Sequence, residues 1–194
     1  VVLKHHTVPG GYAHEFKRRG FRFEVDLHAH DDAGRGGWLH PILDDLGVLD
    51  RVEFSEIDPF YTARFPDLEI TVRGDLSDYL RKLKGAFPEE SDGIDALFAA
   101  IARVASDTVR YSENRTSGSR PTAMEMMERY PDMAQAFSLD WRTFMAMYIG
   151  DARLQAVAST LWGYFGLPPS QVSAGLFALA LHSYHTSGAW YPRG

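Results

Sequence analysis

The 194-residue sequence contains no cysteine. Disulfides, thiolate metal sites and cysteine nucleophiles are therefore excluded, and the lack of disulfides is compatible with a cytoplasmic protein. The longest apolar stretch, residues 174–181, is far shorter than the roughly 20 residues of a membrane-spanning helix. The formal net charge is −6 and the Lys and Arg residues are scattered, so nucleic acid is not an expected partner.

The hydrophobic pattern predicts an α+β fold. The first 72 residues favour strands because apolar and polar side chains alternate over short runs. One helix is expected among them at 38–46, with Gly47 suited to its C-terminal cap. Pro59 and the Pro66-Asp67 pair indicate turns. The expected strands are 21–26, 51–57, 61–65 and 69–72.

Helical periodicity dominates after residue 75. Asp75 can cap the first of these helices, and a longer one follows Pro88 with an apolar face at helical spacing. Residues 111–120 are rich in Ser, Gly, Asn and Arg and are expected to form a loop. Residues 121–188 are expected to be helical. The predicted N-caps in this part are Ser138, Asp151 and Ser170.

A histidine cluster follows the strand predicted at 21–26. His28 and His30 lie two residues apart, with Asp26 before them and an aspartate pair after them. Such a pair at a strand end can point two imidazoles at one metal, as in metal-dependent hydrolases. A catalytic metal needs at least three protein ligands, and the remaining candidates, His40, His182 and His185, have no strand-end placement. The alternative hypotheses are therefore a hydrolase that uses His28 and His30, and polar loop residues with no metal.

A broader signal is an ordered series of short motifs. A Pro-Gly-Gly turn at 9–11 is followed by the basic-Gly-aromatic step Arg19-Gly20-Phe21 and then by a strand. In this order the chain resembles flavoproteins of the phytoene desaturase, carotenoid isomerase and retinol saturase kind, over nearly its whole length. The matching segments are 8–13, 16–25, 46–54, 65–67, 74–76, 87–90, 163–170 and 188–194.

The resemblance implies flavin adenine dinucleotide (FAD) as cofactor. The glycines of the turn would let the backbone approach a pyrophosphate or ribityl chain. The segment after the strand would line the isoalloxazine ring, with His28 as the candidate catalytic group. The residues that the resemblance assigns to the cofactor are Pro9, Gly10, Gly11, Asp26, Leu27 and His28.

Three features depart from the family pattern. The Gly-x-Gly-x-x-Gly loop that supplies phosphate-binding N–H groups does not occur in the sequence. Lys4 stands where the family usually has an acidic residue that holds the adenosine ribose, and Asp26 stands where it often has Gly. We therefore expect an internal part of a longer enzyme that binds FAD poorly by itself.

The resemblance also implies two functional regions. Residues 1–37 would belong to the FAD-binding domain, and residues 38–194 to a substrate region, with a β-meander to about 74 and helices after it. The expected substrate is a lipophilic polyene or isoprenoid that is desaturated, saturated or isomerised, with peripheral membrane contact in an otherwise cytoplasmic protein. A non-catalytic remnant is the further alternative. The aromatic and Met-rich residues that would form either a core or a substrate tunnel are Trp141, Phe144, Met145, Met147, Tyr148, Leu161, Trp162, Tyr164, Phe165, Phe177, Leu181 and Tyr184.

Overall fold

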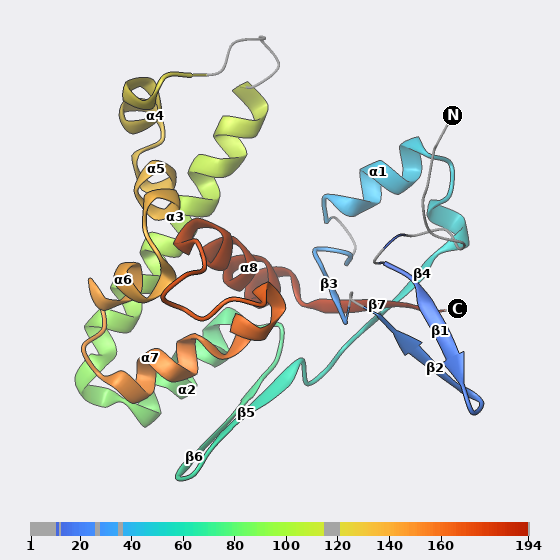
Figure 1. The fold of residues 1–194 in the computed structure, drawn as a ribbon, viewed down its shortest axis with the longest axis horizontal. Coiled ribbons are helices and arrows are strands. Elements are labelled where there is room, and N and C mark those ends of the chain that lie inside the picture. Colours follow the sequence, from blue (N-terminus) through green and yellow to red (C-terminus); the bar gives the residue numbers. More distant parts are fainter. Residues whose placement is uncertain (1–10, 12, 26–27, 35–36, 115–120, 194) are drawn as a thin grey trace. The chain divides into compact units, whose positions relative to one another are not determined.

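The computed structural model describes residues 11, 13–25, 28–34, 37–114 and 121–193. The chain divides into two compact units, Val1–Ile57 with Ala189–Gly194, and Asp58–Gly188. Small antiparallel sheets and one helix form the first unit, whereas a hairpin and a set of helices form the second (Figure 1). The α+β prediction is confirmed. The boundary expected between residues 37 and 38 separates an FAD-binding region from a substrate region. It concerns function and stays a prediction.

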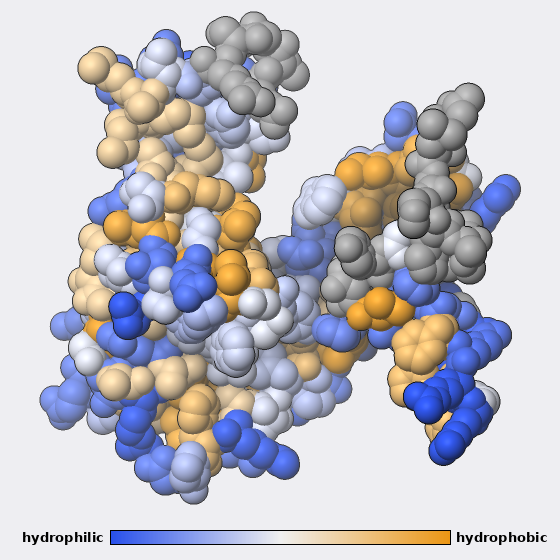
Figure 2. Space-filling view, in the orientation of Figure 1, coloured by the Kyte–Doolittle hydropathy of each residue, from blue (hydrophilic) through white to orange (hydrophobic). Residues whose placement is uncertain are grey.

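A β-hairpin opens the described part of the first unit. Its strands are β1 (Glu15–Arg18) and β2 (Phe21–Glu24). Arg19 and Gly20 join them with φ of 53° and 85°, and a two-residue type I′ turn requires positive φ at both positions. Phe16 lies opposite Phe23, and their rings stack at 5.1 Å. Exposed apolar and hydrophilic side chains lie next to one another on this hairpin (Figure 2).

A three-stranded antiparallel sheet completes the strands of this unit, in the order β3-β7-β4. Its members are β3 (His30–Asp31), β4 (Glu53–Glu56) and β7 (Ala189–Arg193). The central strand β7 was not predicted, because its partners lie more than a hundred residues earlier in the chain. The expected helix is α1 (Leu39–Asp45), and Gly47 after it has φ of 65°, as a C-terminal cap requires. A short 3₁₀ turn, Leu49–Arg51, leads into β4.

The second unit begins with a hairpin that the sequence predicted. Strands β5 (Tyr61–Phe65) and β6 (Leu68–Val72) pair antiparallel around the turn at Pro66-Asp67. Helix α2 (Leu76–Ala86) follows, and the carboxylate of Asp75 accepts hydrogen bonds from the N–H groups of Ser77 and Asp78. The predicted cap is therefore confirmed.

Helices α3, α5 and α8 pack on one another and form the centre of the second unit (Figure 1). Trp141 and Phe177 stack at 4.6 Å in its core, where both are fully buried. None of the helices in the described part is both long and apolar enough to cross a bilayer. The elements are the 3₁₀ turn η2 (Pro88–Glu90), α3 (Ser91–Asn114), α4 (Ala123–Arg129), α5 (Pro131–Ser138), α6 (Trp141–Ala146), α7 (Ala152–Ala158), η4 (Thr160–Phe165) and α8 (Ala174–Ser187).

Three local predictions in this unit were wrong. Helix α3 continues to Asn114 instead of ending near residue 110, and the Asn114 amide donates to the Tyr130 hydroxyl at 3.1 Å. The hydroxyl of Ser138 bonds to Gln135 within α5, and Asp140 caps α6 in its place. Ser170 lies in a turn, and α8 begins at residue 174. The predicted cap Asp151 is confirmed, since its side chain accepts from two N–H groups of α7.

Candidate functional site

The predicted cofactor segment is described at two of its six residues. Pro9, Gly10, Asp26 and Leu27 lie outside the described residues, as does Lys4. Gly11 lies in an exposed turn with φ of 65°, a conformation that favours glycine. Among the described residues other than its chain neighbours, no atom lies within 4 Å of the position that a Cβ would take there. The open space at Gly11 fits a close approach of the backbone to a cofactor, which is what the resemblance requires of this turn.

The histidine pair follows this turn in the same unit. His28 is exposed, whereas His30 is half-buried in β3, with its ring edge-on to Phe54 at 6.2 Å between centroids. Among the described residues, no three His, Asp or Glu side chains gather closely enough to hold a metal ion. In the described part of the chain, His28 and His30 therefore have no third side chain beside them that could complete the metal site of a hydrolase.

A tight loop fixes the backbone directly after this histidine pair. The side chain of Asp32 accepts a hydrogen bond from the Trp38 N–H at 2.9 Å, and His40 contacts the Ala33 carbonyl at 3.0 Å. A Cβ on Gly37 would lie 2.0 Å from the Asp32 carbonyl oxygen, so only glycine fits there. These contacts join the residues that directly follow β3 to the start of α1.

The second unit contains a cluster of aromatic and titratable rings, which we call the Tyr79 cluster: Phe60, Tyr61, Tyr79, Tyr164, Tyr184 and His185. Residues on β5, α2, η4 and α8 contribute to it, so segments far apart in sequence meet there. The rings of Tyr79 and His185 lie 4.4 Å apart, and those of Phe60 and Tyr184 stack at 4.7 Å. Tyr164 lies 5.9 Å from Tyr184. Tyr79, Tyr184 and His185 are buried, whereas Tyr164 is exposed at the edge of the cluster.

Burial keeps this cluster uncharged. It lowers the pKa of His185 to about 4, against a smaller opposing effect of the hydrogen bond to Leu181. The ring Nδ1 donates that bond to the Leu181 carbonyl at 2.8 Å, so Nε2 is the nitrogen without a proton. Burial also raises the pKa of Tyr61 and Tyr79. The cluster is therefore a neutral polar and aromatic group at physiological pH.

The buried Nε2 of His185 has no hydrogen-bond partner among the described residues, whereas the hydroxyls of Tyr79 and Tyr61 are close enough to influence each other's pKa. An unpaired buried polar group costs roughly 1–3 kcal/mol, and such groups call for a specific reason. From the sequence, His185 was expected only as a weak candidate metal ligand. Polar rings on otherwise apolar helix faces were the only signal for this site.

Most of the aromatic and Met-rich set predicted for the substrate region is core. Trp141, Phe144 and Phe177 are among its buried members, whereas Met147, Trp162 and Tyr164 are exposed. The ordinary core interpretation therefore holds for most of these side chains. The remaining exposed aromatic rings belong to η4, next to the Tyr79 cluster.

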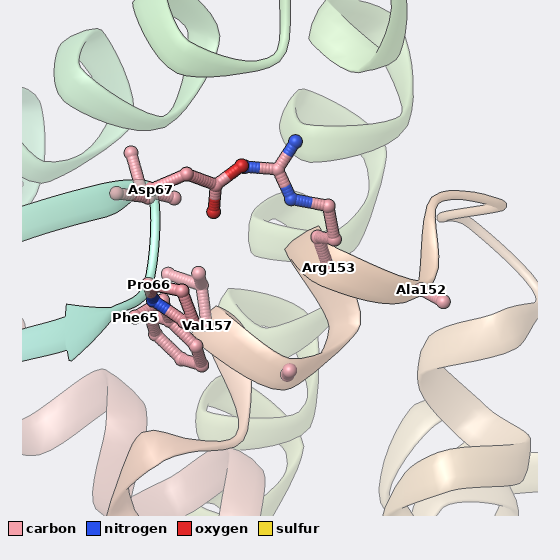
Figure 3. A pocket seen from close by; sticks show the side chains of 8 residues that line it. Phe65, Pro66, Asp67, Ala152, Arg153 and Val157 are labelled. Carbon is pink, nitrogen blue, oxygen red and sulfur yellow. The ribbon is translucent and has the colours of Figure 1, made fainter.

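A pocket lies between the β5–β6 turn and helix α7 (Figure 3). Its volume is about 230 Å³. Asp67 and Arg153 point toward each other at its edge, with 2.6 Å between Oδ2 and Nη2, and the Arg153 guanidinium also lies over the Phe87 ring. Most of the lining is apolar. The lining residues are Phe65, Pro66, Asp67, Leu68, Ala152, Arg153, Ala156 and Val157.

Comparison with known proteins gives one consistent group of relatives. No protein-family model matches the chain. The chain is 25% identical over 203 residues to the all-trans-retinol 13,14-reductase of Homo sapiens, 25% over 202 residues to that of Rattus norvegicus, and 24% over 218 residues to that of Danio rerio. Each alignment covers 100% of this chain and 33% of the relative. The chain thus spans about a third of the length of the curated relatives it matches.

This similarity covers both structural units. It therefore includes the turn at Gly11, the segment around His28, the Tyr79 cluster and the pocket at α7. The metal hypothesis, in contrast, rests only on the short segment around His28 and His30.

Proposed function

We propose that the chain is part of a flavin-dependent oxidoreductase that reduces a carbon–carbon double bond of a lipophilic polyene of the retinoid class. The observation that carries this proposal is the similarity along the whole chain to proteins named for the 13,14-reduction of all-trans-retinol. Among the three reactions expected from the family resemblance, these names favour saturation over desaturation and isomerisation.

The cofactor side is proposed for the first 37 residues. Reduced FAD, when bound, would supply the hydride for reduction of a carbon–carbon double bond and would be oxidised in that step. The turn at Pro9, Gly10 and Gly11 would hold the cofactor by backbone, and the segment Asp26, Leu27 and His28 would lie beside its ring. The left-handed φ and open surroundings of Gly11 support this assignment.

The substrate side is proposed for residues 38–194. Within this region, the Tyr79 cluster combines stacked aromatic rings with phenol and imidazole groups that burial keeps neutral. A polyene needs an apolar, uncharged surface along its length, and aromatic rings provide it. Its lipophilic nature also leads us to propose peripheral contact with a membrane.

Two measurements test this function. All-trans-retinol titrated into the chain should quench tryptophan fluorescence with saturation at micromolar concentration. Replacement of the matched 203 residues of the human reductase by this chain should leave a yellow protein that reduces all-trans-retinol. A chain that binds no retinol, together with a folded flavin-containing chimera that reduces none, would contradict the proposal.

A further inference from the structure

The pocket between the β5–β6 turn and α7 is too small for a whole lipophilic ligand. Its volume of about 230 Å³ lies below the roughly 300–1,000 Å³ of sites that enclose a complete small molecule. Phe65, Pro66 and Leu68 line it from the hairpin, and Ala152, Ala156 and Val157 from α7. A space of this size and lining is suited to one hydrocarbon end group.

The charged residues of the pocket are engaged with each other. Asp67 and Arg153 form an exposed ion pair at the edge (Figure 3). The Phe87 ring lies under the Arg153 guanidinium. No other lining side chain carries a charge or a hydrogen-bonding group. The apolar interior therefore favours an end group without a polar head.

We infer that the α7 pocket binds the cyclic hydrocarbon end of the polyene substrate. This inference rests on the proposed function, since it names a subsite for the proposed substrate. When the cyclic end of the substrate binds, apolar surface of both this ring and the pocket lining is removed from water. Burial of a group of this size strengthens binding about ten- to a hundredfold.

Filling the pocket tests this inference. Ala156 lines the pocket from an exposed position of α7, so Ala156→Phe occupies the space without entering the core. We expect this change to weaken the binding of all-trans-retinol to the protein by about tenfold or more. β-Ionone, which carries the ring with little of the conjugated chain, should no longer compete with retinol for binding. Ala102→Phe, at an exposed position of α3, is the matched control and should leave both unchanged.

The outcomes separate this subsite from the proposed function. Ala152→Phe fills the same pocket from the preceding turn of α7 and serves if Ala156→Phe fails to fold by circular dichroism. Wild-type affinity for retinol in a folded pocket-filling variant would overturn the subsite and leave the proposed function standing. Weaker binding in Asp67→Asn but not in Ala156→Phe would place the hydroxyl end there and overturn it too. If the wild-type chain binds no retinol, the subsite is overturned, and the proposed function falls only if the folded chimera also reduces no retinol.

Discussion

The imidazole ring of His185 lies against the phenol ring of Tyr79, with 4.4 Å between the ring centroids. Phe98 is the other ring that faces this histidine, and His182 lies one turn away on α8. Both Tyr79 and His185 are almost fully buried. No carboxylate is described among these neighbours, so a proton on His185 would have no counter-charge.

The stability of the chain should consequently depend on pH through His185. Burial holds its pKa at about 4, whereas the unfolded chain binds a proton near the ordinary value of 6.5. The free energy of unfolding therefore falls as the pH drops from about 6.5 to about 4, and this contribution is constant outside that window. The shift corresponds to roughly 3 kcal/mol.

Urea unfolding at pH 7 and pH 4.5 measures this effect. His185→Phe should reduce the difference between the two pH values, because the variant has no buried imidazole to protonate. His182→Gln is the control, since His182 is half-buried, and it should retain most of the wild-type difference. An equal pH dependence in wild type and His185→Phe would show that His185 is not the responsible group.

Asp107 provides a second test of a buried polar group. It is 5% exposed on α3, and its Oδ2 accepts hydrogen bonds from the N–H groups of Asp132 and Met133 at the start of α5. Asp107→Ala leaves these two donors unpaired and should lower the free energy of unfolding by about 2–3 kcal/mol in urea. Glu69→Gln, which breaks the exposed pair with Arg64, should change it by less than about 0.5 kcal/mol. Equal effects of the two changes would contradict this account of α3–α5 packing.

Gly37 tests the loop that follows β3. An alanine Cβ there would meet the Asp32 carbonyl oxygen at 2.0 Å, so Gly37→Ala must displace the loop. We expect a clear loss of thermal stability and altered amide resonances of His30 and Asp31. Gly85→Ala is the opposite case: outside the backbone of its own helix α2 and its chain neighbours, no atom of the described residues lies within 4 Å of the added Cβ. Alanine should therefore stabilise the chain by roughly 0.5–1 kcal/mol. Unchanged resonances of β3 in Gly37→Ala would contradict this expectation.

The sequence predicts that the chain by itself binds FAD weakly. Because it has no Gly-x-Gly-x-x-Gly loop, the chain offers no known cradle for the pyrophosphate, and we expect no micromolar binding in a flavin fluorescence titration. The chimera with the human reductase should bind FAD, since that protein provides the remaining two-thirds of the length. Micromolar affinity in the chain alone would show that the turn at Gly11 and the segment after β2 suffice.

Local signals in the sequence predicted most elements correctly. Asp75 and Asp151 cap their helices, Pro66-Asp67 turns the β5–β6 hairpin, and Gly47 ends α1. Each of these depends on side-chain chemistry within a few residues, which the sequence displays directly. The end of α3 was missed because Asn114 bonds to Tyr130, a partner from another element.

The candidate site, too, has some features that the local sequence predicts and others that depend on tertiary contacts. The sequence by itself determined the α+β class, the helix caps Asp75, Asp151 and Gly47 and the family resemblance, because periodicity, capping and motif order are local properties. Only the tertiary structure decided that Tyr79 meets His185, that β7 pairs between β3 and β4, and that the hairpin turn and α7 enclose a pocket. These contacts join residues far apart in the chain, and which apolar faces meet depends on packing of the whole unit.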